Sequence, residues 1–133
     1  MVSGRPEPDL VLVERVGRIA TALPDAYEEE AWTGVRWRVR KHTFAHVLML
    51  SPETTSTRSG HEHLPGLIFR STGEELLALS HAGPPFFTLS WGDDVVALLL
   101  DDSTDWEEVA ELVTESYRIR APRMLVRRLD GSS

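Results

Sequence analysis

Residues 35–40 alternate large apolar and cationic side chains, reading Val-Arg-Trp-Arg-Val-Arg. Because successive side chains of a strand point to opposite faces, Arg36 and Arg38 share one face and Trp37 lies on the other. Arginine binds phosphate and carboxylate through paired hydrogen bonds, so a row of guanidinium groups suits an anion. The alternation predicts a half-buried strand with anion-binding chemistry on its solvent side.

Two interpretations of this arginine row stay open. The acidic residues Glu28 to Glu30 lie just before it, and an adjacent strand would let them form cross-strand pairs of roughly 0.2–1 kcal/mol each. The row would then be the solvated side of a strand. Alternatively, the arginines contact phosphates of a nucleic acid. Trp37 points away from them, which argues against a platform of stacked bases among the arginines.

Basic residues cluster in two short stretches, although the chain carries a formal net charge of −7. Of the 14 basic residues, four lie within positions 36–41 and five within positions 118–128. An acidic protein binds a polyanion only where its positive charge is segregated. The second stretch follows a predicted helix, whose dipole accounts for Arg118 and Arg120. It does not account for Arg123 and the arginines after it.

Other chemistries find little support in the sequence. The absence of cysteine excludes disulfides, thiolate zinc sites and cysteine nucleophiles. His61 and His63 could supply two imidazoles, but no spacing ties a third ligand to them, so we predict no metal site. His46 is expected to pack in the sheet with a backbone partner. The chain has neither a Gly-x-Ser-x-Gly elbow nor a glycine-rich phosphate loop. We therefore predict a non-enzymatic protein without a cofactor.

Hydrophobic periodicity and capping signals define the expected elements. An apolar stripe predicts a first helix from about Asp9 to Ala22, ended by Pro24. Capping boxes at Thr72 and Glu75 and at Thr104 and Glu107 predict a middle helix, reaching about His81, and a last helix. Strands are predicted at 35–40, 43–50, 67–69, 86–89 and 95–100. The segment up to Glu30 is predicted as an acidic strand or turn, and residues 40–42 as a turn. Residues 51–65 are predicted as an exposed loop, and residues 123–128 as an edge strand or loose tail.

These elements predict one α+β domain of 133 residues with its core at about 9–128. Short connections favour an antiparallel sheet, packed against the N-terminal, middle and C-terminal helices. The four tryptophans are expected to pack in the core or at turns. The N-terminus lacks an apolar signal region and no apolar run reaches membrane-spanning length, so a cytoplasmic protein without a membrane partner is expected.

Several short motifs resemble the MmcQ/YjbR family over about residues 9–128. In that family a Trp opens a strand, and a helix follows that ends in a Ser-Tyr pair before a short basic tail. The motifs similar to this pattern are Trp91 to Asp101, Trp106 to Val113, Ser116-Tyr117, Ala121 to Leu125 and, upstream, Trp37-Arg38-Val39, Thr43-Phe44-Ala45 and Leu67 to Arg70. Residues 40–42 replace a turn that is usually glycine-rich, and residues 83–88 are uncharged where the family has a basic stretch.

The resemblance implies a compact CyaY-like domain, described as a double-wing nucleic-acid-binding fold. Our leading hypothesis is a binding domain that contacts DNA or RNA. Its candidate contact residues are Arg36, Arg38, Arg40, Lys41, Arg70 and Arg123. The alternative is a protein-interaction or small-ligand module whose arginine row meets an acidic partner, with no role in nucleic-acid binding.

Overall fold

The computed structural model describes residues 8–50, 64–89 and 91–131. Within this part of the chain, six strands form one antiparallel sheet in the order β1-β2-β3-β4-β6-β5. In chain order the elements are α1 (Leu10–Thr21), β1 (Tyr27–Glu30), β2 (Val35–Val39), β3 (His42–Leu50), β4 (Leu64–Arg70), α3 (Gly73–Ser80), β5 (Phe86–Thr88), β6 (Val95–Leu99), α4 (Trp106–Arg120) and α5 (Arg123–Leu129). The predicted α+β class and antiparallel sheet are confirmed.

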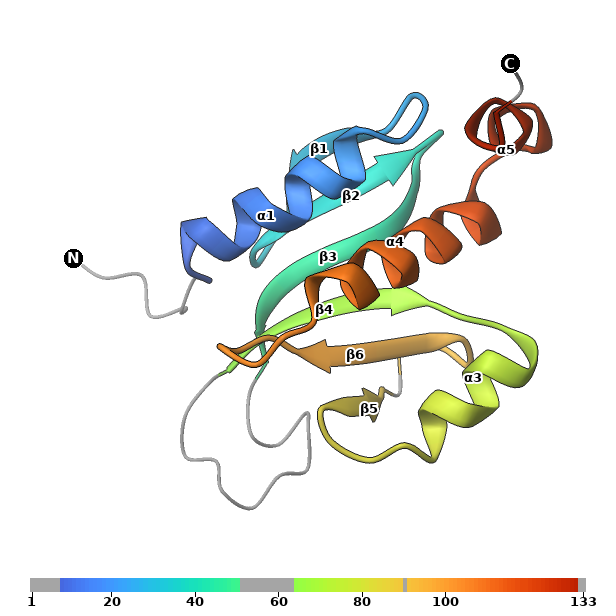
Figure 1. Ribbon diagram of the computed structural model, residues 1–133. Coiled ribbons are helices and arrows are strands. Elements are labelled where there is room, and N and C mark those ends of the chain that lie inside the picture. Colours follow the sequence, from blue (N-terminus) through green and yellow to red (C-terminus); the bar gives the residue numbers. More distant parts are fainter. Residues whose placement is uncertain (1–7, 51–63, 90, 132–133) are drawn as a thin grey trace.

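The main core lies between the sheet and the helices that cover one of its faces (Figure 1). Trp37, Phe44 and Tyr117 are fully buried there, and the rings of Phe44 and Tyr117 meet edge to face at 5.4 Å. We call this side of the sheet the helix face. The opposite side, which we call the outer face, carries a smaller apolar cluster that includes Ile68 and Val95. The strand alternation therefore sorts Trp37 to the helix face and Arg36 to the outer face, as predicted.

Helix ends follow the prediction in position but differ in their caps. Asp9 caps α1, since its Oδ1 accepts the Val11 N–H at 2.9 Å. The two predicted capping boxes are wrong. Thr72 precedes α3 without a side-chain cap bond. Asp105, rather than Thr104, caps α4 by accepting the first N–H groups of the helix. An ionised carboxylate at this position also interacts favourably with the helix dipole.

Two segments have a different secondary structure from the one that the sequence predicts. Residues 123–129 form α5 rather than an edge strand or loose tail, because Leu125 and Leu129 are four residues apart and turn one helical side toward the core. Leu64 and Pro65, predicted in a loop, pair with β3 as the start of β4. The rest of that predicted loop, residues 51–63, lies outside the described residues.

The tryptophan prediction is confirmed for two residues and wrong for two. Trp37 is fully buried and Trp106 packs against the core. Trp32 and Trp91, by contrast, are 81% and 52% exposed. Their positions in connections between strands leave the rings on the surface. Because tryptophan is mostly buried on average, the exposed ring of Trp91 is a candidate contact for a ligand.

The turn between β2 and β3 consists of Arg40 and Lys41, which both have positive φ, 50° and 71°. Two-residue hairpin turns of this mirror-image type usually contain Asn-Gly, because residues with a Cβ pay roughly 1–2 kcal/mol in the left-handed region. The predicted turn is confirmed, with His42 already paired to Val39 in the ladder. The conformation directs two cationic residues to the tip of the hairpin.

Candidate functional sites: an arginine row, a basic end and a hollow

The arginine row on the outer face is held by a carboxylate of the neighbouring strand. β1 pairs with β2 so that Glu29 lies opposite Arg36. Glu29 Oε1 accepts hydrogen bonds from Arg36 Nε at 2.7 Å and from Arg38 Nη1 at 3.1 Å. The hydrogen bond from Arg36, and to a smaller extent that from Arg38, holds the pKa of Glu29 below its ordinary value. The cross-strand pairing interpretation is thus confirmed, and the row carries less free positive charge than its sequence suggests.

Glu28, the neighbour of Glu29, lies on the other side of the strand. Its Oε1 accepts a hydrogen bond from the Trp37 indole Nε1 at 3.1 Å. The acidic run before the row therefore divides by strand alternation between the two faces. Of the carboxylates at positions 28–30, Glu29 is the one ion-paired to the row in the structure.

Arg70 has a similar partner on the outer face. Its Nη1 donates to Asp94 Oδ1 at 2.7 Å, from the end of β4 to the residue before β6. The backbone of Arg70 is also fixed. Its N–H donates to Ser116 Oγ at 2.8 Å, and that hydroxyl donates to the Phe44 carbonyl at 2.6 Å. Ser116 is fully buried, so α4 holds β3 and β4 through one side chain.

The other three predicted contact residues lie at one end of the molecule. Arg40 Nη2 is 3.1 Å from Asp25 Oδ2, and Asp25 Oδ1 is 4.0 Å from Arg128 Nη1. One carboxylate therefore joins the β2–β3 turn to α5, and Figure 1 shows α5 beside that turn. We call this group the basic end; it consists of Arg40, Lys41, Arg123, Arg127 and Arg128, all of them exposed. The fold thus brings together the two basic stretches of the sequence.

Helix α5 positions the arginines of the basic end. Leu125 is fully buried beneath it, while Arg123, Arg127 and Arg128 face outward. Among the described residues, Lys41, Arg123 and Arg127 make no ion pair. Sequence reasoning named Arg123 but missed Arg127 and Arg128 as candidates. The four-residue spacing of Leu125 and Leu129 was the signal that would have placed them on a helix surface.

Helix α4 separates acidic from basic charge along the molecule. Its cap and first turn carry Asp105, Glu107 and Glu108, whereas its last turn carries Arg118 and Arg120. Fifteen residues of helix span about 22 Å at 1.5 Å per residue. The basic end therefore lies more than two Debye lengths, each about 8 Å at physiological salt, from the acidic start of α4.

Arg118 closes the corner between α4 and α5. Its Nη1 donates to Asp130 Oδ2 at 2.9 Å, just past the end of α5. The hydrogen bond from Arg118 lowers the pKa of Asp130 and raises that of Arg118 itself. Arg118 is therefore ion-paired within the corner between α4 and α5, and we do not count it among the cations of the basic end.

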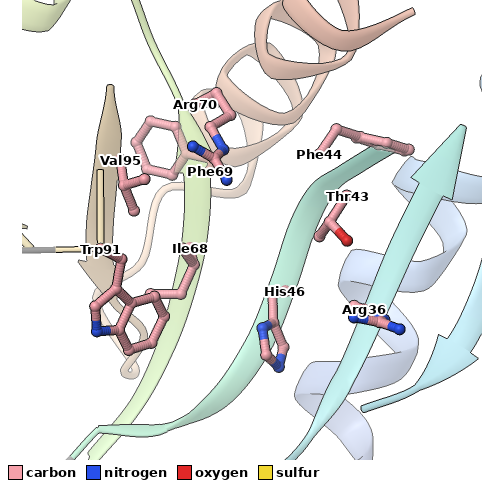
Figure 2. Close-up of a pocket in the computed structure, with 9 residues that line it drawn as sticks. All are labelled: Arg36, Thr43, Phe44, His46, Ile68, Phe69, Arg70, Trp91 and Val95. Carbon is pink, nitrogen blue, oxygen red and sulfur yellow. The ribbon is translucent and has the colours of Figure 1, made fainter. Parts of the chain in front are cut away.

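A hollow of about 170 Å³ lies on the outer face between Arg36 and Arg70. Figure 2 shows the His46 ring and the Trp91 indole at this hollow, with Ile68 beside them. His46 Nε2 lies 2.7 Å from the Thr33 carbonyl, which confirms the predicted backbone partner. Burial lowers the pKa of His46, the proximity of Arg36 adds to this, and the Thr33 carbonyl opposes it. Sequence reasoning missed this grouping because Trp91 is distant in sequence and was expected to be packed.

The described residues support neither a metal site nor a membrane-spanning helix. Within residues 8–50, 64–89 and 91–131, no three His, Asp or Glu side chains form a group that could hold a metal ion. His61 and His63 lie outside these ranges, so the prediction about them stays a prediction. In the same ranges, no helix has the length and apolar character needed to cross a bilayer.

Comparison with known proteins supports the resemblance noted in the sequence. The chain is similar in structure to a protein from Pseudomonas syringae, known from a crystal structure, with a TM-score of 0.66 and 12% identity over 80% of this chain and 96% of that one. At that identity the likeness concerns the fold alone. No curated protein matches the sequence. The model of the YjbR family matches residues 21–119, which include the strands of the sheet, α3 and most of α4 but not α5, and the chain belongs to the YjbR family.

Proposed function

We propose that this chain is a non-enzymatic binding domain that contacts the phosphate backbone of nucleic acid through its basic end. The observation that carries the proposal is the meeting of the β2–β3 turn and α5 over Asp25. Five exposed cations gather there from two distant parts of the sequence. Phosphate contacts of this kind need cationic density rather than a shaped pocket, and they bind without regard to sequence.

The strength of the local charge favours the basic end over the arginine row. On the outer face, Glu29 and Asp94 pair with Arg36, Arg38 and Arg70. At the basic end, Asp25 pairs with two of the five cations, Arg40 and Arg128. The net charge of −7 repels a polyanion at long range, but screening confines that repulsion to about a Debye length. A segregated end can therefore bind a polyanion at moderate salt.

Binding of fluorescent single- and double-stranded DNA and RNA at 50 and 200 mM salt tests the proposal. If the basic end contacts about three phosphates, a slope of about −0.9 per phosphate predicts a loss of affinity of about 40-fold between these salt concentrations. The double variant Arg123→Ala/Arg127→Ala removes two outward-facing cations and should flatten the salt slope by about two units.

The matched control is Arg36→Ala/Arg38→Ala, which changes the formal net charge by the same two units. Both pairs of arginines are on the surface of regular elements, so both variants should fold. We expect the control to retain the salt slope of the parent protein. Absence of binding at 50 mM salt, or equal losses in the two double variants, would refute the assignment to the basic end.

A further inference from the structure

We propose that the hollow on the outer face is a second, independent binding site, which accepts a small aromatic monocarboxylate. Arg36 and Arg70 stand at its edges and provide guanidinium N–H groups for the carboxylate. Trp91 and Ile68 provide apolar surface for the ring. This site lies on β2, β3, β4 and the β5–β6 connection, away from α5, so it does not depend on the nucleic-acid proposal.

The charge around the hollow matches one negative charge. Arg36, Arg38 and Arg70 form a group with Glu29 and Asp94 through ion pairs. Three cations and two carboxylates leave one positive charge on the group. The carboxylates also orient the guanidinium groups, because Glu29 holds Nε and Nη2 of Arg36 and Asp94 holds Nη1 of Arg70. We assign the other N–H groups of Arg36 and Arg70 to the ligand, because the two ion pairs fix both guanidinium groups and preorganised donors lower the entropic cost of binding.

His46 adds a polar surface without adding charge. Since a carbonyl oxygen can only accept, His46 Nε2 must donate to the Thr33 carbonyl, which makes Nδ1 the acceptor nitrogen of the neutral ring. Burial favours the neutral form of His46. The hollow therefore keeps its single positive charge near neutral pH, which is the charge that one carboxylate neutralises.

The volume limits the ligand to one ring. Pockets for drug-sized molecules enclose roughly 300–1,000 Å³, whereas a cavity of about 150 Å³ holds benzene. The hollow, at about 170 Å³, lies close to the smaller value. The apolar side chains of Ile68 and Val95 line it together with the Trp91 indole, which is 52% exposed and can cover one face of an aromatic ring.

Titration of the full-length chain with benzoate, followed by two-dimensional NMR and calorimetry, tests this site. We expect saturable shifts of the Trp91 indole and His46 resonances, and affinity at least tenfold higher for benzoate than for benzyl alcohol or acetate. Benzyl alcohol lacks the charge and acetate lacks the ring. Absence of shifts up to 50 mM benzoate, or equal binding of the three compounds, would overturn the proposal.

Two variants of the same strand separate the site from general electrostatic attraction. Arg36→Gln removes a residue at the hollow and should weaken benzoate binding at least tenfold. Arg38→Gln removes the same unit of charge from the group but no N–H donor at the hollow, because Arg38 does not line it, and it should weaken binding by less than threefold. Equal effects of the two variants would refute the site, provided that both retain the dispersed NMR spectrum of the folded chain. Neither variant should change nucleic-acid binding at the basic end, so the two proposals can fail separately.

Discussion

The outer face groups three cations and the basic end five, and the two regions differ in the carboxylates that surround these cations. On the outer face, antiparallel pairing places Glu29 directly across from the arginine row, and Asp94 meets Arg70. At the basic end, cations from a turn and a helix converge with Asp25 between them. A sheet register matches opposite charges across strands, whereas the meeting of a turn and a helix can accumulate one sign. Local sequence density is therefore a poor guide to surface potential.

The largest expected effect comes from weakening the packing of α5, which carries three arginines of the basic end, without changing the charge. Leu125 is fully buried beneath α5, so Leu125→Ala should lower the free energy of unfolding by about 2–5 kcal/mol. Loosening α5 should also weaken nucleic-acid binding, although every arginine is retained. Urea denaturation and DNA-binding titrations measure the two effects. Met124→Ala, at a position 57% exposed on the same helix, should change stability by less than about 0.5 kcal/mol.

A second prediction makes the outer face resemble the basic end. Glu29→Gln removes the carboxylate shared by Arg36 and Arg38. Two freed cations should then create a second phosphate-binding surface and steepen the salt dependence of DNA binding by up to about two units. Binding titrations at several salt concentrations provide the measurement. An unchanged slope would show that pairing with Glu29 is not what keeps the row from contacting DNA.

The same carboxylate predicts a pH dependence of stability. The hydrogen bonds from Arg36 and Arg38 lower the pKa of Glu29 in the folded chain below its ordinary value. Its contribution to stability is therefore complete above the unfolded pKa and is lost as pH falls through the lower, folded pKa. Thermal melts between pH 6 and 3 should show a smaller decline in Glu29→Gln than in the parent chain. Parallel declines would contradict the assignment.

The smallest expected effect separates strain from charge at the hairpin tip. Lys41→Gly should stabilise the chain by about 1 kcal/mol, because glycine adopts the φ of 71° without a Cβ penalty. It should also flatten the salt slope of DNA binding by about one unit. Lys41→Ala removes the same charge but keeps the penalty, so it should match the slope of Lys41→Gly without the gain in melting temperature.

Sequence patterns predicted most of the fold because strand alternation and helical stripes are local. The sheet class, the first helix, the turn at Arg40 and the opposite orientation of Arg36 and Trp37 all followed from residue spacing. Predictions that depended on a few residues were weaker. Two plausible capping boxes gave way to Asp105 at α4 and to an uncapped Thr72 at α3. Residues 123–129 formed a helix, and the local signal for it was a single pair of apolar residues four apart, Leu125 and Leu129.

The candidate sites were less predictable than the fold, because they depend on contacts between distant segments. The sequence offered Glu28 to Glu30 as partners for the arginine row, and the structure selected Glu29 by register. The association of Arg40 with Arg128 through Asp25 joins residues from three separate segments. The grouping of Arg36, His46 and Trp91 likewise draws on two strands and a later connection. Such groupings require the tertiary fold.

The buried hydroxyl of Ser116 makes one amide a reporter of helix docking. The Arg70 N–H donates to Ser116 on α4 rather than to a neighbouring strand. Its exchange with solvent deuterium therefore requires α4 to separate from the sheet, whereas strand amides exchange when the ladder opens. Comparison of the Arg70 amide with strand amides would give the free energy of lifting α4, and with it α5, off the sheet. The exchange rate of this one amide would thus measure how firmly α4, and α5 after it, are held on the sheet.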